Sequence, residues 1–253
     1  MMLYRYSPLL LACCLAAPLQ AQNAVPPSTI EIGHERSRLD NGTPHWRETD
    51  ARIQHTLGKH SYVALGLLDS RRFGQKDSQI AVAYAAPLSS TLVGTVEASF
   101  SDTHRVLAKR SVGLSTQYAF APAWLAHTGI RNTRYDAVSV NQGSLGLEHY
   151  IADFSWMATW YPVRAFATTA NSFAVRGNYY YGERSFVGLI AATGEEATPI
   201  GASNVVVADI RSLALIGRHT LTPSWALTYA LSRTRQGSFY SRDGARIGAQ
   251  YAF

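Results

Sequence analysis

Cysteine, long apolar runs and flexible linkers are scarce in this 253-residue sequence. Its two cysteines, Cys13 and Cys14, lie near the N-terminus, so a chain that loses this segment forms neither a disulfide nor a thiol active site. Downstream, no segment reaches the roughly 18 uninterrupted apolar residues of a membrane-spanning helix. No stretch rich in Gly, Ser or Pro and no long-period repeat divides the chain. These absences exclude a thiol enzyme and a helical membrane protein, and they predict a single domain.

Charge is sparse as well. Charged residues make up 16% of the chain, and the formal net charge of +6 is spread without a run or a stripe. Nucleic-acid binding is therefore not predicted, because it requires clustered basic residues. The basic balance fits a surface that meets anionic lipopolysaccharide or an anionic polymer. A mean hydropathy of −0.07 is too polar for a helical membrane protein but compatible with a β-barrel, in which alternation conceals the apolar residues.

Sequence motifs for catalysis and metal binding are missing too. There is no GxSxG elbow, no Gly-rich phosphate loop and no His-x-x-x-His spacing, and His127 and His149 stand isolated. We therefore predict no enzymatic activity, no metal and no cofactor.

An acyl hydrolase is the competing function. Outer-membrane lipid hydrolases resemble one another in a His-x-Ser-Asn-Gly-like run, and this chain has His34 and Ser37 followed by Asn41-Gly42. The odd offset between His34 and Ser37 would place them on opposite faces of a strand. Ser37 would then point inward with Glu35, and His34 would lie near the outer rim on the side of Ile32. A Ser–His dyad is disfavoured, and a lipid-modifying site near the outer rim stays as the alternative.

The N-terminus has the pattern of a secretory signal peptide. Arg5 precedes an apolar run at residues 7–17, and Leu19-Gln20-Ala21 offers a cleavage site, which predicts a signal peptide over residues 1–21. Residues 22–27 would form a short periplasmic leader. A lipoprotein anchored at Cys13 is the less favoured alternative, because apolar sequence continues beyond the cysteines.

The C-terminal segment alternates strictly. The residues from Ala245 to Phe253 at every second position are apolar, and polar or small residues stand between them. Such a strand has one side for lipid and one for water. Tyr251 and Phe253 resemble the terminal signal that barrel-assembly machinery recognises in the Gram-negative outer membrane. We predict that location, after cleavage of the signal peptide.

The same alternation recurs along the chain, most cleanly between residues 80 and 120. It predicts an all-β fold, a single-chain transmembrane antiparallel β-barrel of about 14 strands over residues 28–253. Twelve strands are the alternative, because the segments 124–135 and 143–151 are the least regular. Short connections are expected to alternate with longer external ones, such as 71–76, 102–109 and 136–142. Aromatic residues cluster beside the short connections, as in a membrane-interface girdle: Tyr84, Tyr118, Phe120, Trp124, Tyr179, Tyr181 and Trp225.

The opposite face of these strands supplies the predicted lumen. Its charged residues are mostly acids in the early strands and arginines in the later ones: Glu31, Glu35, Glu48, Asp50, Arg52, Glu97, Arg131, Glu148, Arg176, Arg218 and Arg246. Charges inside a barrel must be hydrated or paired. We expect pairing across the barrel that narrows the lumen, with a selectivity-setting lining as the alternative.

Two basic loops, at residues 71–77 and 102–110, are predicted to face outside. Arg71, Arg72, Phe73 and Asp77 are the candidate contact residues there, because the planar fork of arginine suits lipopolysaccharide phosphates. A solvated loop tip with no ligand is the alternative.

Several short patterns resemble the opening of the YaiO family of outer-membrane β-barrels. They are Glu31-x-Gly33, Ser37-x-Leu39-x-Asn41-Gly42, Trp46 and Arg72-Phe73-Gly74-x-x-Asp77. The resemblance implies a barrel in the outer membrane and implies little about activity. Similar barrels terminate exporters of secreted polysaccharide but carry a long helical-repeat periplasmic portion. The leader from Gln22 has no room for one, so an export role would require a separate partner.

The function expected from the sequence is structural, or the passage of a solute or polymer across the outer membrane. The partners expected are outer-membrane lipid and lipopolysaccharide, the barrel-assembly machinery, and a secreted polysaccharide or small solute as cargo.

Overall fold

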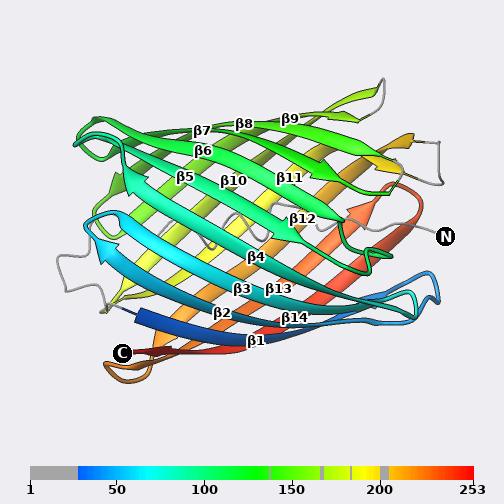
Figure 1. Ribbon diagram of the computed structural model, residues 1–253, viewed down its shortest axis with the longest axis horizontal. Helices are drawn as coiled ribbons and strands as arrows, with labels where there is room; N and C mark the ends of the chain where they lie inside the picture. The colour runs from blue at the N-terminus through cyan, green and yellow to red at the C-terminus, as the bar shows by residue number, and fades with distance from the viewer. Residues whose placement is uncertain (1–27, 137, 166–167, 183, 200–204) are drawn as a thin grey trace.

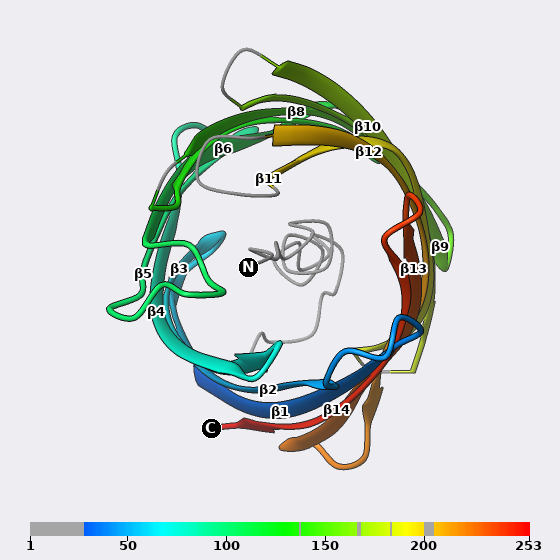
Figure 2. The same cartoon turned by 90° about the vertical axis from the view of Figure 1, so that its right-hand side faces the viewer.

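The chain forms one closed barrel of fourteen antiparallel strands (Figures 1 and 2). The computed structural model describes residues 28–136, 138–165, 168–182, 184–199 and 205–253, without the side chains of 196–199 and 205–207. The predicted signal peptide and leader lie outside these residues. The strands are β1 (Ser28–Leu39), β2 (Trp46–Gly58), β3 (Ser61–Arg72), β4 (Gln75–Pro87), β5 (Leu92–Phe100), β6 (Arg110–Ala121), β7 (Trp124–Arg134), β8 (Ser139–Ile151), β9 (Phe154–Ala165), β10 (Thr168–Tyr181), β11 (Ser185–Pro199), β12 (Val205–Thr220), β13 (Trp225–Gln236) and β14 (Tyr240–Ala252).

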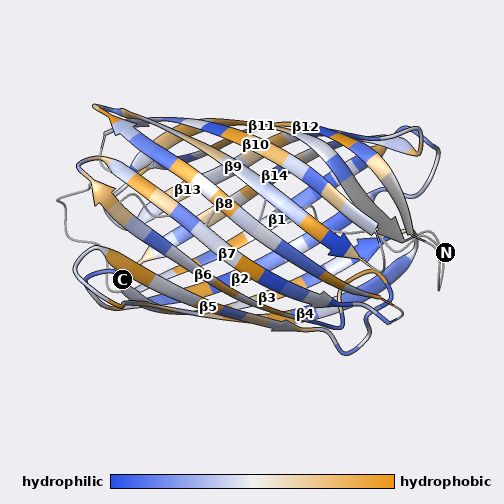
Figure 3. Cartoon of the chain, turned by 90° about the horizontal axis from the view of Figure 1, so that it is seen from above, coloured by the Kyte–Doolittle hydropathy of each residue, from blue (hydrophilic) through white to orange (hydrophobic). Residues whose placement is uncertain are grey.

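Alternation of side chains decides which face of each strand meets lipid. Large apolar residues at every second position are exposed on the outside, for example Ile32 at 56% and Ile130 at 66%. The residues between them are small or polar and face inward, and Figure 3 shows the two kinds intermixed along each strand. A sheet with its apolar side outward suits a bilayer, and closure leaves no unpaired edge.

The seam of the barrel is the pairing of β1 with β14. Eleven residue pairs run from Thr29 opposite Ala252 to Leu39 opposite Arg242. Backbone N–H groups of Ser28 and Phe253 each donate to the carbonyl of the other residue. The prediction of a closed fourteen-stranded barrel is confirmed. The alternative of twelve strands is wrong, because β7 and β8 pair along eleven consecutive positions despite their less regular sequences.

The two ends of the barrel have different connections. At one end, here called the turn end, the connections include residues 59–60, 122–123 and 152–153. The first strand, β1, begins at this end, and the last strand, β14, ends there. The opposite end, the loop end, holds the connections 40–45, 73–74, 101–109, 135–138 and 237–239. The predicted separation into short and long connections is wrong for several of these, because the strands continue through residues that the sequence analysis assigned to loops.

The connection after β3 shows the difference most clearly. A polar loop was expected over residues 71–76, but the chain reverses in the two-residue turn Phe73-Gly74. Both residues have positive φ angles, of 52° and 76°. Glycine adopts this conformation without strain, which explains the Gly at the second position.

Aromatic side chains surround the turn end on the outside. Phe154 and Tyr179 have ring centroids 4.8 Å apart, and Trp225 and Tyr251 are equally close. Trp124 stacks on His149 at 3.9 Å. Rings with polar tips favour the membrane–water interface, so these contacts form a girdle at the place predicted for one.

No helix among the described residues is long and apolar enough to cross a membrane.

Candidate functional site: the lumen wall

The inward faces of the strands bring the predicted lumen charges into one interior. All of those residues alternate with outward-facing neighbours, and Glu48 and Glu148 are buried at 6% and 4% exposure. Their partners decide what the wall can bind, because a buried charge needs an opposite charge or a hydrogen bond.

Arg246 on β14 is the centre of one charged group. Its Nη2 atom donates to Asp50 Oδ2 at 2.7 Å and to Glu31 Oε1 at 2.9 Å. Thr228 donates to the same Glu31 oxygen at 2.9 Å. A Cβ atom at Gly33 would lie 2.2 Å from that Nη2, so glycine makes room for the guanidinium. Closure of the seam therefore brings a cation of the last strand to the acids of the first two.

A second group lies at the loop end around Trp46, which is 2% exposed. The guanidinium carbons of Arg72 and Arg242 lie over its ring, 4.7 and 4.8 Å from the centroid. Arg72 also donates from Nε to Glu48 Oε1 at 2.7 Å. Five apolar and aromatic residues pack together here and form the loop-end cluster: Leu39, Trp46, Phe73, Phe239 and Tyr240.

Two further pairs lie on the wall between β5 and β8. Arg131 forms an ion pair with Glu97, two strands away, and His127 Nε2 lies 2.9 Å from Glu148 Oε2 on the next strand. These pairs, like those of Arg246 and Arg72, join neighbouring or next-nearest strands. The expectation of pairing across the barrel is wrong for them: the pairs run along the wall, because in-register neighbours lie much closer than opposite walls.

The wall from β10 to β12 differs, because its charges are arginines. Arg176 donates from Nε to Asn178 Oδ1 at 2.8 Å, and its guanidinium lies 5.8 Å from the ring centroid of Phe186. Arg218 is directly opposite Phe186 in the register, and its Nε is buried without a hydrogen-bond partner among the described residues. We call Arg176, Phe186 and Arg218 the arginine wall. The described inward positions of β9 to β13 hold no carboxylate.

Arg52, another of the predicted lumen charges, donates to Gln54 Oε1 at 3.2 Å on its own strand.

Asp77 holds the connection between β5 and β6 against the interior. The backbone N–H groups of Val106 and Leu107 donate to its Oδ2 at 2.5 and 2.9 Å. Asp77, Val106 and Leu107 are all at most 2% exposed. Figure 2 shows part of this connection reaching over the mouth of the barrel. The 101–109 loop thus narrows the loop end.

The prediction that four residues contact ligands outside is wrong for three of them. Arg72 and Asp77 are buried inside the barrel, at 0% and 1% exposure, and Phe73 is part of the loop-end cluster. Only Arg71 faces outward and is exposed. The signal for this was present in the sequence: Arg72 continues the inward positions Leu68 and Ser70 at a spacing of two.

A hydrogen bond outside the lumen also joins Asp40 and Ser241 at the loop end. The backbone N–H of Ser241 donates to Asp40 Oδ1 at 2.7 Å. This hydrogen bond from Ser241 lowers the pKa of the Asp40 carboxyl below its ordinary value of 3.8, because it stabilises the charged form. The hydrogen bond joins the β1–β2 connection to β14.

Comparison with family models decides the relationship. The model described as the YaiO membrane β-barrel domain matches residues 27–198. The chain belongs to the YaiO family. The resemblance seen in the sequence is confirmed, and a search of curated proteins found no match.

Solved structures share the fold of this YaiO domain at low sequence identity. The CymD monoaromatic hydrocarbon channel has a TM-score of 0.63 at 10% identity, with 93% of this chain and 90% of that chain covered. A bacterial polysaccharide outer membrane secretin has a TM-score of 0.59 at 10% identity, covering 91% and 100%. A loop-deletion mutant of OmpT, an outer membrane protein of Vibrio cholerae, has 0.54 at 10%, covering 89% and 98%. The YaiO membership and these neighbours together point to the Gram-negative outer membrane.

Six of the residues that carry the YaiO resemblance lie at two places. Trp46, Arg72, Phe73 and Leu39 meet in and beside the loop-end cluster, and Glu31 and Gly33 surround Arg246. Both places connect the first strands to β14. Part of the family pattern in the early strands therefore lies along the seam.

The residues of the hydrolase alternative lie on opposite faces, as predicted. Ser37 donates to Glu35 Oε1 at 2.9 Å inside, whereas His34 Nδ1 lies 3.0 Å from Thr49 Oγ1 on the outside. Among the described residues, no group of three or more His, Cys, Asp or Glu could hold a metal ion.

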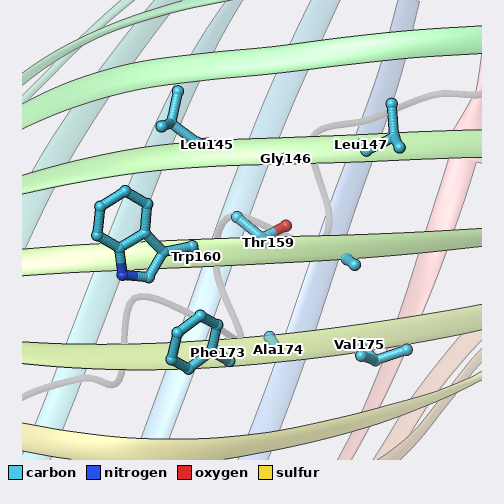
Figure 4. Close-up of a pocket in the computed structure, with 9 residues that line it drawn as sticks. Leu145, Gly146, Leu147, Thr159, Trp160, Phe173, Ala174 and Val175 are labelled. Carbon is cyan, nitrogen blue, oxygen red and sulfur yellow. The ribbon is translucent and has the colours of Figure 1, made fainter.

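An open hollow lies on β8, β9 and β10 (Figure 4). Most of the side chains that line it are apolar and outward-facing, including Leu145, Trp160 and Phe173. Lipid chains, and not a polar solute, match this surface.

Proposed function

We propose that this YaiO-family barrel is a passage for polar solutes across the outer membrane, with a preference for anions. The observation that carries the proposal is the arginine wall. Arg218 has a buried Nε without a partner, and Arg176 beside it has an amide and a ring as its partners in the contacts above. An anionic solute or a segment of an anionic polysaccharide would supply the missing acceptor.

The arrangement of charges around the lumen supports the same proposal. Acids and bases are paired on β14, β1, β2 and β3 and from β5 to β8, whereas the described inward side of β9 to β13 has no carboxylate. An anion in the lumen would be attracted to the side that carries these arginines. Confinement strengthens this attraction relative to bulk water, since the wall lowers the effective dielectric constant.

Planar bilayers containing the purified protein test the proposal. Wild-type protein is expected to give ion currents whose reversal potential in a salt gradient indicates anion preference. The double variant Arg176→Gln, Arg218→Gln should still conduct, with the reversal potential shifted toward cations. The matched control is Arg110→Gln, Arg134→Gln, which removes two outward-facing charges and should leave selectivity unchanged. Absence of currents, or identical selectivity in all three proteins, would contradict the proposal.

The hydrolase alternative is tested separately with phospholipid vesicles. We propose that the barrel is not an enzyme, because Ser37 and His34 lie on opposite sides of β1. The release of fatty acid should not exceed that of empty vesicles. A rate that Ser37→Ala abolishes would establish the alternative.

A further inference from the structure

Four cations form a continuous row on the outside of the loop end. Arg36 on β1 is directly opposite Arg47 on β2, Arg47 is opposite Arg71 on β3, and Arg71 is opposite Lys76 on β4. All four side chains are exposed and outward-facing. Directly opposed residues on adjacent strands have Cα atoms about 4.5–5.5 Å apart. We call these residues the cation row.

Most of the row lacks a counter-charge in the protein. Among the described residues, Arg36, Arg47 and Arg71 form no ion pair or side-chain hydrogen bond, whereas Lys76 pairs with Asp69 at 2.9 Å. The other charged or titratable outward-facing groups beside the row are His34, Arg38 and Asp243, and Asp243 lies opposite Arg38 and Arg233. Like charges directly opposite one another destabilise a sheet. The row is therefore a place where an external anion would stabilise the barrel.

The height of the row identifies the kind of anion. Ile32, Ala51, Leu67 and Ile80 form the register row four residues closer to the turn end, and their large members are more than half exposed to the outside. Four residues along a strand correspond to about 13 Å before tilt is considered. The cation row thus lies just beyond an apolar, lipid-facing row, at the level of lipid headgroups.

We infer that the cation row binds the phosphate groups of lipopolysaccharide in the outer leaflet, with the loop end facing the cell exterior. Guanidinium groups bind phosphate oxygens through paired N–H donors, and several guanidiniums in line can hold more than one phosphate of the same lipid. Arg71 thereby keeps the phosphate contact expected from the sequence. Arg36 and Arg47 take the place of the buried Arg72.

Binding of fluorescently labelled deep-rough lipopolysaccharide to the detergent-solubilised barrel tests the inference. The Kd of the variant Arg36→Gln, Arg47→Gln, Arg71→Gln should be at least roughly tenfold higher than that of the wild type. The control variant Lys59→Gln, Arg105→Gln, Lys109→Gln removes the same charge from exposed positions outside the row and should bind like wild type. Equal losses in the two variants would show non-specific attraction and overturn the inference, as would no loss in either.

The source of the phosphate is tested with two other probes. Phosphatase-treated lipopolysaccharide should compete poorly with the labelled lipid, and inorganic phosphate should compete only at far higher concentration. Equal competition by the dephosphorylated lipid would refute a phosphate contact. Competition by inorganic phosphate at the same concentration as the lipid would refute a lipid site.

A single substitution covers the case in which the triple variant does not fold. Arg47→Gln removes two like-charge oppositions at the centre of the row. In lipopolysaccharide-free micelles this variant should unfold at a higher temperature than wild type, and with lipopolysaccharide present the order should reverse. The same order under both conditions would overturn the inference.

Discussion

Arg71 and Arg72 are neighbours in the chain, but their side chains lie on opposite sides of the barrel wall. Arg71 is exposed in the cation row, and Arg72 is fully buried against Glu48 and Trp46. The period of two in a strand produces this difference. At the residue scale, the position of a side chain within the alternation therefore decides whether a cation meets lipid or the lumen.

Trp46 provides a prediction at this scale. Trp46→Ala removes a buried indole beneath two guanidiniums, so we expect the free energy of unfolding to fall by about 3–5 kcal/mol. Urea unfolding in lipid vesicles measures this change. Trp225→Ala, which removes a lipid-facing indole that is 48% exposed, should cost much less. Similar losses in the two variants would contradict the role given to the loop-end cluster.

The strands continue further at the loop end than the sequence indicated. Polar and charged residues occupy both faces there, as at Arg71 and Arg72, so the alternation between apolar and polar residues disappears although the backbone pairing continues. A loop and the end of a strand beyond the membrane both consist of polar and charged residues, so the sequence does not distinguish them. Where one face stays apolar, as in β5 and β6, the sequence predicts the strands closely. At the element scale, hydropathy alone therefore locates the membrane part of a strand and misses its rim.

The 101–109 loop provides the prediction for an element. Asp77→Ala removes the acceptor for the N–H groups of Val106 and Leu107, so the loop should leave the mouth of the barrel. Trypsin should then cut after Arg105 or Lys109 roughly tenfold faster or more, because cleavage requires a locally released segment. Asp102→Ala is the matched control on the exposed part of the loop and should be cut at the wild-type rate.

At the scale of the whole molecule, closure joins parts that sequence reasoning treated separately. The alternation in the sequence indicated which charges point inward. It did not indicate the register between neighbouring strands, which decides which of these charges form ion pairs with one another. Arg246 meets Glu31 and Asp50 because β14 pairs with β1. The cation row was missed for the same reason, since Arg36, Arg47 and Arg71 are far apart in sequence and become adjacent only through two hairpins.

Closure itself can be tested by a cross-link over the seam. Ile32 and Ala249 are directly paired on β1 and β14, and residues 28–253 contain no native cysteine. The variant Ile32→Cys, Ala249→Cys should form a disulfide under mild oxidation, which SDS gel mobility of the unreduced, boiled protein detects as a compact form. The pair Ile32→Cys, Ala245→Cys is offset by four residues and should not cross-link. Equal cross-linking of the two pairs would contradict the register.

The direction of the five tryptophans gives the barrel a built-in optical label. Trp124, Trp156, Trp160 and Trp225 lie on the outward positions of their strands, and Trp46 lies inside among arginines. Bromine-substituted lipids would quench the emission of the four outer indoles and leave that of the inner one. The remaining light would then report on the mouth of the barrel alone, so a molecule arriving there could be followed without attaching a dye.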